Sequence, residues 1–597
     1  MRGNLDEARK HIEESLTLIE TVRARSGSQQ LRASYRASMA KVYEFYIDLL
    51  MQQHAANPSL GHDAEAFQAS ERGRARSLLE LLSEAHVDIR QGVETAVIER
   101  ERNLTQLLNA KAQRQIQLMA RKGSQDEIAT LNKEISTLED EYQQVQATIR
   151  KTSPGYAALT QPQPLTLKEI QQQLDSDTLL LEYSLGEERS YMWAVAQKSL
   201  KSYVLPKREQ TEKIARRVYE LLTTRSLFRP GENAAVKQQR IAQADSQLLE
   251  TSGELSQMVL GPVATELGTK RLVVVADGAL QYVPFGALPV PSVVSGQLSV
   301  ADSRTADNGL RTTNNGQRTN DTPLIVDNEI MSLPSASAIA VQRKGLQGRK
   351  PAANAVAVIA DPVFSSNDER LKLNVRNAAK SPDQTDGVAN TRVIEHLADD
   401  PGELVIRRLR FTRQEAEQIL AVAPRASNLK AIDFKATRAT ATGGELSKYR
   451  YVHFATHGYL DSERPDLSAV VLSLVDEQGK PQDGFLRAHE IYNLNLPAEL
   501  VVLSACQTGL GKEIKGEGLV GLTRGFMYAG AARVVVSLWN VNDKATADLM
   551  TKFYEKILKQ GARPAAALRA AQVEMWKQKQ WQSPYYWAAF TMQGEWR

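Results

Sequence analysis

The C-terminal half of the chain is a series of short, almost wholly apolar runs separated by helical patterns. Strands that are apolar on both faces and alternate with helices are typical of an α/β fold, a mostly parallel sheet flanked by helices. Ligands of such sheets bind at the carboxyl ends of the strands. The expected strands lie at residues 271–275, 356–359, 451–455, 469–474, 500–503 and 534–538, and the expected helices at 413–423, 518–529, 545–559 and 564–577.

A smaller α/β part is predicted over residues 160–290, ahead of a main α/β domain over 291–597. Two stretches rich in Ser, Asn, Asp, Gly and Thr, 297–321 and 365–390, are expected to be mobile surface loops. In the smaller part, strand patterns lie at 179–183, 191–195 and 203–205, and helical patterns at 208–226 and 242–260.

Residues 1–90 show the pattern of amphipathic helices. Their start, Gly3-Asn4-Leu5-Asp6-Glu7-Ala8, resembles the second helix of a tetratricopeptide (TPR) repeat. A repeat stack needs about three units to bury a continuous core, so we expect a truncated array that begins in mid-repeat. A plain helical hairpin is the alternative.

Residues 91–152 predict a coiled-coil helical hairpin that turns at Lys122-Gly123-Ser124. The pattern does not decide whether the two helices pack on each other or on a second copy of the chain. The heptad positions are Ile128, Leu131, Ile135, Leu138, Tyr142, Val145 and Ile149.

Composition excludes several classes of protein. The single cysteine allows no intramolecular disulfide, which suits a reducing compartment. A net charge of +4 on 597 residues is too small to indicate direct nucleic-acid binding. The chain has no apolar run of about 18 residues, and its start lacks a signal-peptide core. We therefore expect a cytoplasmic protein without a membrane span.

Two predicted strand ends carry residues suited to catalysis. One strand leads into Thr456-His457-Gly458 and another into Ala505-Cys506-Gln507. A parallel sheet brings both ends to one edge, where an imidazole can take the proton of a thiol and later protonate a leaving amine. The N–H groups of Gly458 and Cys506 could form an oxyanion hole.

The alternative for Cys506 is a small buried apolar residue, the commonest role of a lone cysteine. Here a turn sequence follows the cysteine, and the His-Gly pair stands 49 positions upstream. This arrangement is close to the caspase signature, although Ser504 replaces the glutamine and Thr508 displaces the glycine by one position. The combination favours a catalytic role.

The motifs His453–Gly458, Leu503–Gly509 and Ser537–Asp543 resemble those of the CHAT family, and the resemblance extends over about 255–597. CHAT proteins are caspase-like cysteine proteases of the clan of caspases and separase, common in bacteria and often attached to TPR repeats. The resemblance implies a dyad with His457 as general acid/base and Cys506 as nucleophile, without metal or cofactor. It also implies that 160–290 is a pseudo-caspase-like part.

Asp543 has two interpretations. In separase, a relative, an aspartate after a similar strand lines the pocket for a basic P1 side chain, and a carboxylate beside the dyad could pair with arginine or lysine. Asp543 also precedes the expected helix 544–559, and aspartate is a favoured N-cap residue. Both roles are compatible.

These observations predict a cysteine endopeptidase that cleaves protein or peptide substrates after a basic residue. A regulatory protein partner is expected to bind the TPR-like helices. One alternative is a catalytically silent signalling scaffold built from the TPR-like and coiled-coil helices. Another is acyl transfer by the same dyad, since His457 and Cys506 suit any acyl-enzyme reaction.

Overall fold

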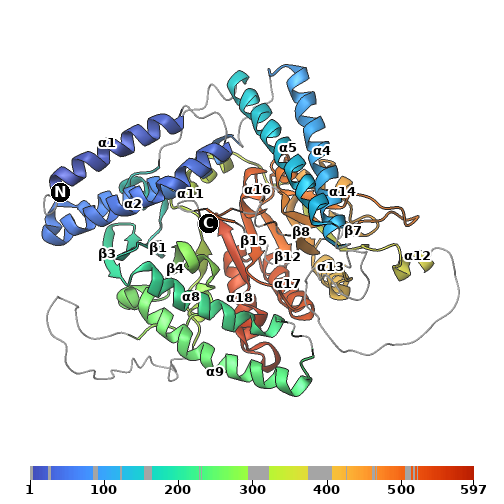
Figure 1. The fold of residues 1–597 in the computed structure, drawn as a ribbon. Helices are drawn as coiled ribbons and strands as arrows, with labels where there is room; N and C mark the ends of the chain where they lie inside the picture. Colours follow the sequence, from blue (N-terminus) through green and yellow to red (C-terminus); the bar gives the residue numbers. More distant parts are fainter. Residues whose placement is uncertain are drawn as a thin grey trace.

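A single eleven-stranded sheet forms the centre of the computed structural model, with helices on both faces (Figure 1). Cys506, the expected loop 297–321 and residues 374–390 of the second expected loop lie outside the described residues. The structure describes residues 5–24, 29–84, 92–120, 124–153, 164–227, 229, 231–292, 322–373, 406–424, 427–459, 461, 464, 467–504, 512–514, 518–520 and 522–597.

The strand order of the central sheet is β3-β2-β1-β4-β5-β16-β15-β12-β8-β6-β7. Strands β15, β12, β8, β6 and β7 are all parallel, so their carboxyl ends share one edge. This half meets the rest of the sheet where β15 and β16 pair antiparallel. The strands are β1 (Thr178–Ser184), β2 (Ser190–Ala196), β3 (Ser199–Leu205), β4 (Arg271–Val275), β5 (Ile330–Ser332), β6 (Asn354–Pro362), β7 (Asn428–Asp433), β8 (Tyr449–Ala455), β12 (Leu500–Ser504), β15 (Arg533–Ser537) and β16 (Phe590–Gly594).

Both faces of the parallel half are buried, as the continuous apolar runs predict. In β8, Val452 and Phe454 join the core on one face, together with Phe526 of a covering helix. Tyr451 and Ala455 join the core on the opposite face, together with Ile419 of another helix. The structure confirms a mostly parallel sheet flanked by helices, preceded by an all-helical region.

The helices fall into two groups, those of the α/β region and those of the N-terminal region. Those of the α/β region are α7 (Leu167–Gln173), α8 (Arg208–Thr223), α9 (Ala234–Val259), α10 (Ala264–Leu267), α11 (Ala338–Leu346), α12 (Glu369–Leu373), α13 (Arg410–Val422), α14 (Arg438–Thr442), α15 (Ala488–Ile491), α16 (Leu522–Tyr528), α17 (Asp543–Leu558) and α18 (Pro564–Trp576). Those of the N-terminal region are α1 (Leu5–Ala24), α2 (Gln29–Ala56), α3 (His62–Glu84), α4 (Thr95–Ala120) and α5 (Gln125–Thr152).

Buried hydrogen bonds join helix α3 to the α/β region. The Glu71 carboxylate is fully buried and accepts hydrogen bonds from the backbone N–H groups of Ala336 and Ser337, at 3.0 and 2.8 Å. Ser70 donates to the buried carboxylate of Glu182 at 2.7 Å. Burial raises the pKa of Glu182 well above its ordinary value, and the nearby Glu71 adds to this effect. Helix α3 therefore shares a core with the sheet.

Helices α4 and α5 pack side by side as an antiparallel hairpin (Figure 1). Leu108 and Ala112 of α4 meet Leu131 and Ile135 of α5 in a small core. Leu467 of the α/β region inserts into the same core. The hairpin is thereby attached to the segment that follows β8.

Three local expectations are wrong. The helix expected at 518–529 begins only at Leu522, and Gly518–Val520 is strand β14, paired with β13 (Lys512–Ile514). Glycines at 516, 518 and 521 disfavour helix there. The strand expected at 469–474 ends at Val471 and belongs to a separate three-stranded sheet.

The third correction concerns the expected loop 365–390, because its first part is ordered. Glu369–Leu373 is helix α12, and the Arg370 side chain is buried between aspartates. Ion pairs between residues distant in sequence leave no local signal, which explains the error.

Within the described part of the chain, no helix is both long and apolar enough to cross a membrane.

Candidate active site at the carboxyl edge of the sheet

The pairing of β8 with β12 brings together the two strand ends that the sequence singles out. Ala455, the last residue of β8, lies opposite Ser504, the last residue of β12. His457 follows Ala455 by two positions, and Cys506 follows Ser504 by the same interval. The described residues thus place His457 at the edge from which the chain continues toward Cys506.

His457 is fully buried, and its ring is held from two sides. Its Nε2 lies 2.7 Å from the backbone carbonyl oxygen of Arg407. The Phe364 ring packs edge-on against the imidazole, with the ring centroids 5.2 Å apart. A carbonyl oxygen only accepts hydrogen bonds, so the proton of the neutral imidazole resides on Nε2. Nδ1 then carries the lone pair that can accept a thiol proton.

The small sheet fixes the backbone around His457. Strand β9 (His457–Tyr459) pairs antiparallel with β10 (Ala469–Val471), which also pairs with β11 (Phe485–Arg487). In this register, His457 lies opposite Val471 and Gly458 lies opposite Val470. Gly458, the expected oxyanion residue, is therefore part of a strand adjacent to the imidazole.

A buried polar cluster lies beneath the strand ends. The Glu415 carboxylate of α13 accepts hydrogen bonds at 2.8 Å from both Nε2 of His453 and the hydroxyl of Ser504. All three side chains are fully buried. The ring of Tyr554 packs edge-on against His453. Burial, reinforced by the charge of Glu415, raises the pKa of Tyr554 well above its ordinary value.

Asp543 is almost fully buried at the start of α17. The interpretation of Asp543 as the N-cap of this helix is wrong, because the N-cap is Asn542, whose side chain accepts from the Ala545 N–H at 3.0 Å. The Asp543 carboxylate instead accepts from the backbone N–H of Phe411 at 2.9 Å, in the first turn of α13. The segment from Arg407 to Phe411 therefore contacts both His457 and Asp543.

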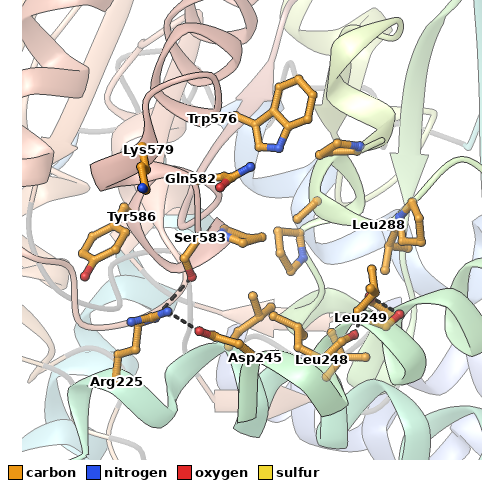
Figure 2. A pocket seen from close by; sticks show the side chains of 18 of the residues that line it. Arg225, Asp245, Leu248, Leu249, Leu288, Trp576, Lys579, Gln582, Ser583 and Tyr586 are labelled. Carbon is orange, nitrogen blue, oxygen red and sulfur yellow. Dashed lines mark hydrogen bonds and ion pairs between the residues drawn. The ribbon is translucent and has the colours of Figure 1, made fainter. Parts of the chain in front are cut away.

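A cavity of about 630 Å³ lies between α8, α9 and the turns after α18 (Figure 2). Its polar end holds Arg225, which pairs with Asp245 and donates to the Ser583 hydroxyl at 3.2 Å. Burial raises the pKa of Asp245, and Arg225 opposes this effect. The described residues that line the cavity include neither histidine nor cysteine. His457, Gly458 and Asp543 are not among the lining residues either, so the cavity is separate from the candidate site and offers no second dyad.

Several contacts around His457 are invisible in the sequence. The carbonyl of Arg407 acts through the backbone, so no side-chain motif reports it. Phe364 follows an expected strand and Glu415 lies in the expected helix 413–423, but no motif in either segment indicates which residue it contacts. The basic run Arg407-Arg408-Leu409-Arg410 was the one available signal for this region.

Fold and site together define an α/β protein with a histidine fixed at one strand end and a cysteine expected just beyond the next. The CHAT domain family matches residues 249–595, more than half of the chain. The chain belongs to the CHAT family.

Two curated relatives match shorter parts of the chain. The chain is 36% identical to human tetratricopeptide repeat protein 28 over 113 residues, and 38% identical to the mouse protein over 109 residues. These matches span only 4% of the length of either relative.

Two cysteine-protease structures align at low similarity. The Saccharomyces cerevisiae separase–securin complex aligns with 99% of this chain and 38% of its own, at 12% identity and a TM-score of 0.43. The Arg-specific cysteine proteinase gingipain R covers 65% of this chain and 75% of its own, at 11% identity and a TM-score of 0.29.

Proposed function

We propose that the protein is a cysteine endopeptidase in which Cys506 attacks the scissile carbonyl and His457 transfers the protons. The observation that supports this proposal best is the register of β8 and β12. Ala455 and Ser504 are directly opposed in this register, and in the sequence His457 and Cys506 each follow one of them by two residues. CHAT membership is consistent with this chemistry.

The position of the proton on the neutral His457 ring suits the proposed steps. With Nε2–H donated to Arg407, Nδ1 of the neutral ring takes the Cys506 proton as the thiolate adds to the carbonyl carbon. The imidazolium then gives this proton to the departing amine nitrogen, which leaves an acyl-enzyme thioester. Water deprotonated by His457 hydrolyses the thioester and regenerates the thiol. In the proposed site, the backbone N–H groups of Gly458 and Cys506 stabilise the oxyanion.

We further propose that Asp543 selects a basic P1 side chain. Its carboxylate is joined to the segment that contacts His457, and it lies at the N-termini of two helices, α13 and α17. Helix N-termini favour the ionised carboxylate. A negative charge held beside the dyad would pair with arginine or lysine of a polypeptide substrate.

Regulation by a protein partner is proposed to reach the site through the hairpin. Arg464 donates to the Asn132 side chain of α5 at 3.0 Å, and Arg487 of β11 donates to the Asn109 carbonyl of α4 at 3.3 Å. Strand β11 pairs with β10, which pairs with the strand that starts at His457. A partner that moves the hairpin would therefore act on the sheet that carries the histidine.

The test is single-turnover cleavage of a peptide library varied at P1, by the wild type and by Cys506→Ala. We expect turnover that requires Cys506 and is concentrated on arginine and lysine. An acyl-probe experiment accompanies it, because an absent activator would silence both proteins. Labelling of Cys506 that depends on His457 identifies a latent protease. No labelling, together with no turnover, contradicts the proposal and favours the signalling scaffold.

A further inference from the structure

The two groups that hold the His457 ring share one anchor. Phe364, which packs on the ring, follows Asp361 by three residues. Arg407, whose carbonyl faces Nε2, is followed by Arg408, and the guanidinium of Arg408 binds the Asp361 carboxylate with two hydrogen bonds of 2.9 and 2.8 Å. The contacts form a closed ring from Asp361 through Arg408 and Arg407 to His457, and back through Phe364.

Asp361 is held in place by several arginine side chains. Its carboxylate is fully buried, and it also accepts a hydrogen bond from Nε of Arg413 at 2.9 Å. Arg370 donates to the Asp361 backbone carbonyl at 2.8 Å and to Asp433 at 2.7 Å. Three arginines from separate places in the sequence thus converge on the ends of β6 and β7.

The backbone at this point is strained. Asp361 has φ of +47° and Asp433 has φ of +55°, and within the described residues they are the non-glycine positions with positive φ. Such conformations are unfavourable for residues with a side chain and persist where surrounding contacts enforce them. They occur frequently at functional sites, and here they lie at the ends of β6, which pairs with the strand that leads to His457, and of β7, the next strand along the sheet.

From this closed ring of contacts we infer that Asp361 and Arg408 are positioning residues that hold the Arg407 carbonyl against Nε2 of the catalytic histidine. The inference rests on the proposed function, since it assigns to these residues the orientation of its acid/base. The bidentate pair fixes the peptide between Arg407 and Arg408 in place. With the pair intact, the Nε2 proton stays on the carbonyl side, and Nδ1 keeps the lone pair that the proposed proton transfer requires.

The experiment measures alkylation of Cys506 by iodoacetamide between pH 5.5 and 9.5, read from intact mass. It needs no substrate, and because the chain has a single cysteine each adduct is unambiguous. The variants are Arg408→Gln, Arg408→Lys and His457→Ala. Arg343→Gln is the matched control, because Arg343 forms a bidentate pair of similar burial with Glu595, on a different part of the fold. Thermal unfolding is measured for each variant.

We expect Arg408→Gln to slow alkylation about tenfold at pH 6, by analogy with metal-binding histidines, for which loss of the orienting hydrogen-bond partner costs at least that factor. At pH 9.5, where the thiol ionises without help, its rate should stay within about twofold of the wild type. Arg408→Lys keeps the positive charge but cannot form the bidentate pair with the Asp361 carboxylate. It should therefore restore the alkylation rate only in part. Arg343→Gln should lower thermal stability while keeping the wild-type pH profile.

The outcomes separate the two proposals. If Arg408→Gln keeps the wild-type pH profile of alkylation and His457→Ala does not, the positioning role is overturned and the dyad stands. A wild type that reacts like a free thiol, with a midpoint near pH 8.5 and no effect of His457→Ala, overturns the dyad and the positioning role together. An equal loss at pH 6 and pH 9.5 indicates a general structural effect and also contradicts the positioning role.

Discussion

Ala455 and Ser504 are direct partners in the parallel pairing of β8 and β12, at the last residue of each strand. Both side chains are fully buried, so the register is enforced by packing on the two faces of the sheet. A slip of one residue would exchange the faces of the whole strand. The relative position of the two candidate catalytic segments is therefore a property of the sheet.

The first prediction concerns the dyad. His457→Ala should lower kcat for peptide hydrolysis by about 10²–10⁴-fold, because proton transfer by a positioned imidazole contributes that much. His11→Ala, at a half-exposed position in α1, is the control and should leave kcat unchanged. Steady-state hydrolysis of an arginine-containing peptide checks both, and full activity in His457→Ala would refute the assignment.

The second prediction separates the proposed P1 selection by Asp543 from its structural role as acceptor for the Phe411 N–H. Asp543→Asn retains an oxygen that can accept from Phe411 but loses the charge, so kcat/KM for arginine at P1 should fall about 100-fold with little change in stability. Asp543→Ala should also lower the free energy of unfolding by about 1 kcal/mol, because the α13 terminus loses its acceptor. An unchanged P1 preference in both variants would leave Asp543 with the structural role alone.

The third prediction concerns the buried cluster. Glu415→Ala leaves His453 and Ser504 without their shared acceptor and should lower the free energy of unfolding by about 3 kcal/mol. Glu417→Ala, on the same helix but exposed, should change it by less than about 0.5 kcal/mol. Urea unfolding followed by circular dichroism measures both, and equal effects would contradict a specific role for the cluster.

The fourth prediction tests the route from the hairpin to the site. Leu467→Ala removes the side chain that the α4–α5 core holds, so the small sheet around His457 should become less protected from hydrogen exchange. We expect kcat to fall several-fold with KM unchanged. Val236→Ala, at an exposed apolar position of α9, serves as control. Wild-type kcat and wild-type exchange in Leu467→Ala would argue against transmission through the hairpin.

The fifth prediction is a pH dependence of stability. Burial alone would raise the pKa of Glu595, but hydrogen bonds from Arg343 and from the Arg597 backbone lower it below the ordinary 4.5. A folded-state pKa below the unfolded one means that the ionised carboxylate stabilises the fold above about pH 4.5, and that this contribution is lost as the pH falls through the folded-state value. Glu595→Gln should cost about 2 kcal/mol at pH 7 and progressively less below pH 4.5. A difference that is constant from pH 7 to pH 3 would contradict this assignment.

Much of the fold could be read from the sequence because its signals are local. Val501, Val502 and Leu503 form a continuous apolar run, and such a run predicts a strand buried on both faces wherever it occurs. The helix expected at 545–559 follows from its 3.6-residue periodicity, and the structure has it at Asp543–Leu558. The helix expected from Gly518 failed because glycines weigh against helix more strongly than the apolar pattern favours it.

The sequence by itself determined the mostly parallel α/β class, the N-terminal helices and the two strand ends that carry His457 and Cys506. Only the tertiary structure decided what holds His457, because the Arg407 carbonyl, the Phe364 ring and the Asp361–Arg408 pair come from segments far apart in the chain. Periodicity reports which face of an element is buried, whereas the partner of a buried polar group depends on which elements the sheet order brings together. That order is set by packing across the whole core, which no local pattern encodes.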